Sequence, residues 1–180
     1  MEDNYTAGLR QTLASHLDTL QRNLAVVSLE ILKTKYKKPF RDLCQNIRLS
    51  ASAYVKQVAL KDIRIHSKYL AETVPLIESA IQQSGILPMV TAAAFRRQDI
   101  TEIDTLASEL KIYILEALEP FFARHMGLYV SKECLADPDR QPELYNDVTG
   151  CILRDGAWVP LLNQESLLFL TLKEKADPAA

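Results

Sequence analysis

Residues 9–38 contain neither proline nor glycine, and their apolar side chains recur at a fixed spacing. Successive members of the series lie four or three positions apart, which is the heptad spacing of a helix with one apolar face. The series is Leu13, Leu17, Leu20, Leu24, Val27 and Ile31. Because most residues between them are polar, we predict an amphipathic helix over 5–38. At the helical rise per residue such a helix is about 45 Å long, which exceeds what a compact globule needs.

Pro39 interrupts this pattern and opens the next one. The residue before a proline avoids helical geometry, whereas proline itself fits the first turn of a new helix. We therefore predict a second helix over 39–84, with a kink near Pro75. Its apolar positions are Leu43, Ile47, Ala51, Tyr54, Val58, Tyr69, Thr73, Ile77 and Ile81. Since the connection is so short, the two helices are expected to pack antiparallel as a long hairpin.

For the second half of the chain the sequence predicts shorter elements. Helices are expected over 87–95, 101–130 and 160–175. Thr101 and Asp104 have the spacing of a helix capping box. Residues 134–160 are rich in proline, aspartate and glycine, which predicts a loop that encloses a short helix near 142–151. The predicted fold class is all-α: a single helical domain over 1–180, with a hairpin and a core of four to six helices.

The composition sets the class of protein. A hydrophobic share of 48% and a charged share of 24% are globular values, which excludes a disordered or collagen-like chain. No apolar run approaches the roughly 20 residues that a membrane-spanning helix needs. The acidic start of the chain is unlike a signal peptide. The three cysteines form no disulfide framework, so a reducing, cytoplasmic location is expected.

Charge is unevenly distributed along the sequence. Residues 1–68 hold twelve Lys and Arg against six acidic residues, whereas residues 69–180 hold nine against seventeen. Such asymmetry suggests an anionic partner for the first half, or head-to-tail self-association. Two solvated faces without a binding role are the alternative. Charge alone does not decide between them.

The densest cluster of cations falls at the end of the first predicted helix. Its members are Lys33, Lys35, Lys37, Lys38 and Arg41. These residues are candidates for contact with an anionic membrane or a filament of neighbouring subunits. Cations are also favoured at a helix C-terminus, so a solvated helix end is the alternative. Tyr36 and Phe40 lie among them, a pattern that also occurs in single-stranded nucleic acid binding, although we expect no nucleic acid partner.

A second set of cations recurs with helical spacing further along. Lys61, Arg64 and Lys68 lie at i, i+3 and i+7, so they share one face of the second predicted helix. This face is a second candidate for membrane or filament contact. A solvated helix surface is the other interpretation.

The sequence contains no catalytic or ligand-binding motif that we recognise. The three histidines have no histidine or cysteine at metal-ligand spacing, and the five glycines are isolated. Cys44 and His66, the one conceivable nucleophile and base, would be more than about 30 Å apart along the second predicted helix. We therefore expect no enzyme activity, no metal and no cofactor.

The order of the predicted elements resembles the ESCRT-III fold, and within it the increased-sodium-tolerance family. A long hairpin, a short third helix, an acidic fourth helix, a loop and a detached apolar helix follow one another over roughly residues 8–175. The segments that carry the resemblance are Lys68–Thr73, Gly85–Leu87, Ala107–Ile112, Ala123–Gly127, Asn146–Val148 and Ser166–Leu170. None of them is diagnostic alone, because order and spacing carry the match.

The resemblance implies a function in endosomal sorting and membrane remodelling. A protein of this kind is cytoplasmic and peripheral on the endosomal membrane. It binds the C-terminal helix of a charged multivesicular body type ESCRT-III subunit, and it modulates indirectly the AAA ATPase that disassembles the filaments. The groove for the partner helix would be formed at Leu161, Leu162, Leu168, Phe169 and Leu172. The alternative is a helical-bundle adaptor or chaperone that binds amphipathic peptide helices without membrane contact.

Overall fold

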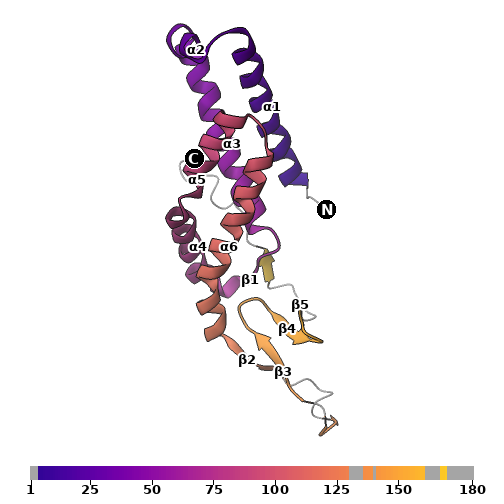
Figure 1. Ribbon diagram of the computed structural model, residues 1–180. Coiled ribbons are helices and arrows are strands. Elements are labelled where there is room, and N and C mark those ends of the chain that lie inside the picture. Colours follow the sequence, from indigo (N-terminus) through magenta and orange to yellow (C-terminus); the bar gives the residue numbers. More distant parts are fainter. Residues whose placement is uncertain (1–3, 130–135, 140, 161–166, 170–180) are drawn as a thin grey trace. The chain divides into compact units, whose positions relative to one another are not determined.

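The structure is a computed structural model that describes residues 4–129, 136–139, 141–160 and 167–169 (Figure 1). Most of these residues are helical, as predicted. The helices are α1 (Asn4–Val26), α2 (Leu29–Lys35), α3 (Lys37–Leu60), α4 (Leu70–Ser84), α5 (Ile86–Arg97) and α6 (Thr101–Arg124). The described residues group into two compact units. One unit is formed by residues 4–60 and 81–113, and the other by 61–80 and 114–169.

The core of the first unit depends on the leucines that define the sequence pattern. Leu13, Leu17 and Leu20 of α1 are buried, and α1 packs against α3. The side chains that α3, α5 and α6 bury in this unit include Ile47, Ala51, Val55, Val90, Ala94, Ile103 and Leu110. The heptad spacing therefore correctly predicts which face of α1 enters the core as far as Leu20.

The first predicted helix is wrong in its second half. The chain leaves helical geometry after Val26, and α2 begins at Leu29 as a separate helix of seven residues. Ser28 is the N-cap of α2, and its hydroxyl accepts a hydrogen bond from the Ile31 amide at 3.3 Å. Serine stabilises a helix start better than a helix interior, and valine is a weak helix former. Val26, Val27 and Ser28 therefore favour a break that the apolar spacing alone does not show.

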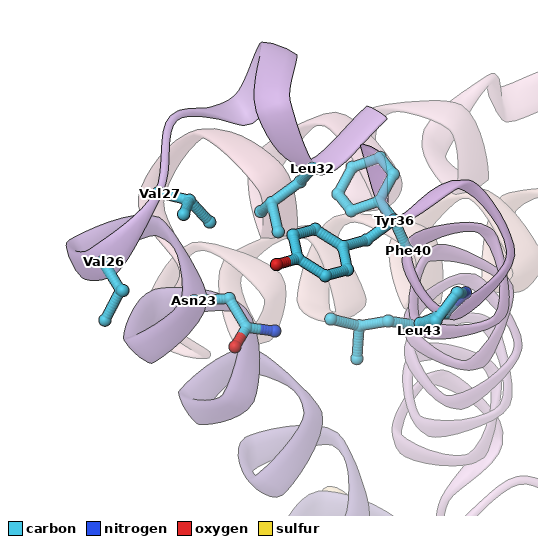
Figure 2. Close-up of a pocket in the computed structure, with 8 residues that line it drawn as sticks. Asn23, Val26, Val27, Leu32, Tyr36, Phe40 and Leu43 are labelled. Carbon is cyan, nitrogen blue, oxygen red and sulfur yellow. The ribbon is translucent and has the colours of Figure 1, made fainter. Parts of the chain in front are cut away.

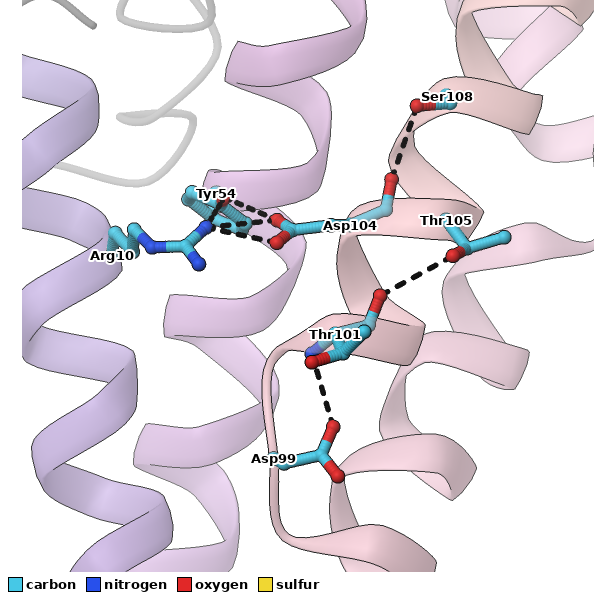
Figure 3. Close-up of polar contacts among 7 residues, drawn as sticks. All are labelled: Arg10, Tyr54, Asp99, Thr101, Asp104, Thr105 and Ser108. Atoms are coloured by element: carbon cyan, nitrogen blue, oxygen red, sulfur yellow. Dashed lines mark hydrogen bonds and ion pairs between the residues drawn. The ribbon is translucent and has the colours of Figure 1, made fainter.

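A polar network joins three helices of the first unit (Figure 3). The Arg10 guanidinium of α1 donates to both carboxylate oxygens of Asp104 on α6, each at 3.0 Å. The Tyr54 hydroxyl of α3 accepts from Arg10 and donates to Asp104. Burial, together with the hydrogen bond to Asp104, raises the pKa of Tyr54 to about 12. The hydrogen bond to Asp104 also raises the pKa of Arg10.

The prediction of one continuous helix over 39–84 is wrong in its middle, where the chain is not α-helical between α3 and α4. Helix α3 ends at Leu60, and Asp62 adopts a left-handed conformation with a φ of 66°. Strand β1 (Arg64–His66) and the 3-10 helix η1 (Ser67–Tyr69) precede α4. Ile63 and Ile65 are both buried while Arg64 between them is not, which is the period-two pattern of a strand. β-Branched isoleucines in this pattern favour extended backbone over helix.

The segment predicted as a loop with a short helix forms an antiparallel sheet. Its strands are β2 (Met126–Tyr129), β3 (Glu143–Asn146), β4 (Cys151–Arg154) and β5 (Ala157–Pro160), paired in that order. The helix predicted near 142–151 is therefore wrong, as is the helical end of 101–130. Asp155 and Gly156 join β4 to β5 with φ values of 53° and 79°. An Asp-Gly pair with two positive φ angles is the preferred two-residue hairpin turn.

The packing of α1 is tested by replacing two leucines of different exposure. Leu13 is 0% exposed on α1, and Leu49 is 59% exposed on α3. Leu13→Ala is expected to lower the free energy of unfolding by about 2–5 kcal/mol, because it leaves a cavity in the core. Leu49→Ala, the matched control, is expected to change it by no more than about 0.5 kcal/mol. Urea denaturation followed by circular dichroism measures both, and equal losses would contradict the α1–α3 packing.

Candidate functional site

The predicted cation cluster lies where α1, α2 and α3 follow one another in the first unit. We call residues 23–43 the basic tip. Two main-chain hydrogen bonds hold its turns: the Tyr36 amide donates to the Leu32 carbonyl at 3.2 Å, and the Phe40 amide donates to the Tyr36 carbonyl at 2.9 Å. Pro39 lies in the first turn of α3, as predicted. Between α1 and α3 the chain therefore reverses direction through the short helix α2 instead of through a simple turn.

The basic tip contains an apolar pocket of about 300 Å³ (Figure 2). It lies between the end of α1, the body of α2 and the first turns of α3. The lining residues are Asn23, Val26, Val27, Leu32, Tyr36, Pro39, Phe40 and Leu43. In Figure 2 the Tyr36 ring lies between Leu32 and Leu43. Only Asn23 and the Tyr36 hydroxyl bring polar side-chain atoms to the lining, so the pocket suits an apolar occupant.

Several apolar side chains of the basic tip face solvent. Val26 is 83% exposed, and Leu29, Ile31 and Tyr36 are exposed as well. Of the apolar residues of α2, Leu32 alone is buried. Single exposed apolar residues are ordinary on a protein surface, but a group of them beside an apolar pocket indicates a contact surface.

The five predicted cations all lie on the exposed surface of the tip. Lys33 pairs with Glu30 at 3.8 Å, and Lys38 pairs with Asp42 at 3.5 Å. Lys35 places its Nζ 5.9 Å from the centroid of the Tyr36 ring. The sequence of the tip holds five cations and only these two carboxylates. Its net charge is therefore positive, and neighbouring acidic residues do not neutralise it.

The position of two lysines argues against a purely structural explanation of the cluster. Lys33 and Lys35 lie in the last turn of α2, where the helix dipole favours cations. Lys37 and Lys38 lie in the first turn of α3, which contains no acidic residue, and there the dipole disfavours cations. Helix stability therefore accounts for only part of the cluster.

The second predicted set of cations does not form a helical face. Lys61 lies in the turn after α3, Arg64 in β1 and Lys68 in η1, all in the second unit. The prediction of a shared stripe is wrong because the helix that would align these residues ends at Leu60. Lys68 instead forms an ion pair with Asp147, with its Nζ 3.0 Å from a carboxylate oxygen.

Asp147 is the centre of a polar cluster in the second unit. It accepts hydrogen bonds from the hydroxyls of Tyr69 and Tyr145 as well as from Lys68. Burial opposes ionisation of the carboxyl, but these hydrogen bonds outweigh burial and lower the pKa of Asp147 below 3.8. The hydrogen bond to Asp147, together with burial, raises the pKa of Tyr69 to about 12. The cluster joins η1 to the β3–β4 turn, so its role is structural.

Two of the five residues predicted to form the groove for a partner helix lie in a strand. Leu168 and Phe169 lie in strand β6 (Leu167–Phe169), which pairs antiparallel with β1. Their predicted helix is therefore wrong at these residues. The pairing joins Arg64 to Phe169 and Ile65 to Leu168. Leu161, Leu162 and Leu172 lie outside the described residues.

The sequence interpretation located the cations of the tip but missed its pocket. Val27 and Leu43 were assigned to helix faces without a binding role. The missed signal is the adjacent pair of valines followed by a serine, which ends α1 and separates it from α2. A second unrecognised feature is the network of Arg10, Tyr54 and Asp104, whose members lie too far apart in sequence for spacing rules to join.

Searches for other kinds of site in the described part of the chain are negative. No group of three or more His, Cys, Asp or Glu residues there could hold a metal ion. No helix in that part has the length and apolar character needed to cross a membrane. Comparison with protein-family models, curated proteins and solved structures gives no match.

The Asp147 cluster predicts a pH-dependent stability. A carboxyl whose pKa is lower in the folded state stabilises the fold above its unfolded pKa, and this stabilisation is lost as the pH falls through the folded-state value. Asp147→Asn is therefore expected to be less stable than the wild type at neutral pH, by an amount that shrinks below about pH 4. Urea unfolding at a series of pH values measures the difference. A constant difference down to about pH 2 would contradict the assignment.

Proposed function

We propose that the protein binds anionic membrane surfaces peripherally through its basic tip and acts there as an assembly factor, without catalysis. The observation that carries this proposal is the coincidence of five cations, exposed apolar side chains and an apolar pocket within residues 23–43.

The magnitudes are consistent with reversible membrane binding. A Lys or Arg near an anionic surface contributes about 1 kcal/mol, so the cluster contributes at most about 5 kcal/mol at low salt. Complete burial of an aliphatic side chain adds about 1.5–3 kcal/mol. Val26 and Ile31 are available for such insertion. Peripheral proteins generally need two such contributions for stable attachment, and the tip offers both.

We extend the proposal to the assembly role that the sequence resemblance implies. In this role the protein binds a charged multivesicular body type ESCRT-III subunit on the endosomal membrane and modulates the AAA ATPase indirectly. The packing of α1 against α3, followed by α5 and an acidic α6, supports the proposal. The end of α3 at Leu60 and the strand at 167–169 remove two features on which the resemblance depended. The predicted groove at Leu161, Leu162, Leu168, Phe169 and Leu172 stays part of the proposal, with Leu168 and Phe169 in a strand.

A second candidate function uses the same pocket. An adaptor or chaperone for peptides could accept one apolar side chain of an acidic amphipathic helix there, with no membrane involved. The apolar lining of the pocket favours this candidate, and the exposed apolar residues around it fit both. The two functions differ in whether vesicles or an acidic helical peptide are bound.

The membrane proposal is tested by two matched pairs of charge reversals. Lys35→Glu with Lys37→Glu changes the basic tip, and Arg48→Glu with Lys56→Glu changes the later part of α3 by the same charge. The tip pair is expected to lower the partition onto phosphatidylserine vesicles by at least about tenfold, because it replaces attraction by repulsion. The control pair is expected to have a much smaller effect. Co-sedimentation at low salt measures both.

Salt and a charge-neutral variant separate the two contributions to membrane binding. Raising the ionic strength should reduce binding by the wild type and remove most of the difference between the two pairs. Val26→Ser with Ile31→Ser leaves the charge unchanged and should weaken the binding that remains at high salt. Equal sedimentation of the tip pair, the control pair and the wild type at low salt would refute the membrane proposal.

The assembly role needs a separate experiment. The full chain is expected to retain the C-terminal helix of a charged multivesicular body type subunit in a pull-down, in preference to a scrambled peptide of the same composition. Retention of both peptides to the same extent, or of neither, would remove the ESCRT-III part of the proposal. The outcome does not affect vesicle binding.

A further inference from the structure

We infer that the pocket in the basic tip binds a single alkyl chain of an anionic amphiphile, with the surrounding cations holding its head group. The inference rests on the proposed membrane contact and specifies its ligand. Charge attraction alone would bring the tip to any anionic surface. A pocket for the alkyl chain would make the contact depend on the chemistry of the lipid.

The lining of the pocket fits an alkyl chain. The end of α1 with the connection that follows it, helix α2 and the start of α3 all contribute aliphatic or aromatic groups. Examples are Val27 in the connection, Leu32 in α2 and Phe40 in α3. The volume of about 300 Å³ is at the lower end of the range for small-molecule sites. Val26 on the rim is 83% exposed, so a chain can reach the pocket from solvent. Water in such an apolar site finds few hydrogen-bond partners and is readily displaced.

The charges beside the pocket select the head group. Lys33 and Arg41 are the sequence neighbours of the lining residues Leu32 on α2 and Phe40 on α3, and both cations are exposed. The Lys35 ammonium lies 5.9 Å from the centroid of the Tyr36 ring, which itself lines the pocket. The head group of an amphiphile whose alkyl chain occupies the pocket therefore lies near positively charged side chains. An anionic head group is the complementary one, whereas a cationic one would be repelled.

The same ligand chemistry has two sources. The alkyl chain could belong to a lipid that remains in a bilayer or to a free fatty acid or lysophospholipid. In both, the alkyl chain supplies most of the binding free energy. Each methylene group transferred from water into an apolar site increases affinity by about fourfold at the usual transfer free energy. Affinity should therefore rise with chain length until the pocket is full.

The first experiment titrates the full chain with sodium carboxylates from hexanoate to dodecanoate, below their micelle concentrations. Calorimetry should show one ligand bound per chain and an affinity that rises by about threefold to fourfold per methylene group before it levels off. Dodecyl maltoside, whose alkyl chain is one carbon longer and whose head group is neutral, should bind at least about tenfold more weakly at low salt. Absence of carboxylate binding, or equal binding of both amphiphiles, would overturn the inference.

Two substitutions fill the pocket without removing a cation. Val27→Trp and Leu43→Trp each place a large side chain at a half-buried position that lines the pocket. Both should lower the affinity for dodecanoate by at least about tenfold, because they exclude methylene groups from the pocket. Leu49→Trp, at a residue of α3 that does not line the pocket, is the matched control. Unchanged dodecanoate binding by a folded Val27→Trp or Leu43→Trp variant would refute the site.

Vesicle binding distinguishes failure of the inference from failure of the proposed function. If vesicles bind through the cations while dodecanoate does not bind, the pocket assignment is wrong and the membrane function stands. If dodecanoate binds and anionic vesicles do not, the pocket is a site for free amphiphiles and the membrane function is wrong. Weaker vesicle binding by a folded Val27→Trp variant at high salt would show that the alkyl chain in the pocket comes from the bilayer.

Discussion

The burial of three leucines on one face of α1 is the constraint on which the first unit depends. Leu13, Leu17 and Leu20 fix α1 against α3, and the ion pair of Arg10 with Asp104 joins α6 to the same end of α1. Beyond Leu20 the series weakens, because Val27 is only half-buried and Ile31 is exposed. A continuous seam would have closed the helices on each other up to the turn. Its interruption leaves room for α2 and for the pocket beneath it.

The parts of the fold that could be predicted are those in which local spacing and tertiary packing agree. The face of α1 as far as Leu20, the proline in the first turn of α3 and the start of α6 are of this kind. Local spacing misled where another rule was stronger. At 63–65 the alternation of buried isoleucines favoured a strand, although the helical spacing of the flanking apolar residues had predicted a helix. At 155–156 the Asp-Gly pair favoured a hairpin turn where a loop had been predicted. Pairing between β1 and β6 joins residues about a hundred positions apart, which no local pattern reveals.

The candidate site was predictable in its charge but not in its shape. Five cations within nine residues are visible in the sequence, whereas a pocket is a property of side chains that three separate segments bring together. The structure also shows where the cations conflict with helix stability. Lys37 and Lys38 occupy a helix start that would be more stable with acidic residues. Residues that oppose local stability in this way are expected at surfaces selected for binding.

Helix α2 is too short to be stable alone. A helix of seven residues in water is dominated by the cost of nucleation, so α2 depends on its serine cap and on Leu32 packing against its neighbours. Leu32 is also part of the pocket wall. Any occupant that packs against this side chain therefore also favours the helical form of α2 over its unfolded form. By thermodynamic linkage, the affinity of the pocket and the helix–coil equilibrium of α2 must change together.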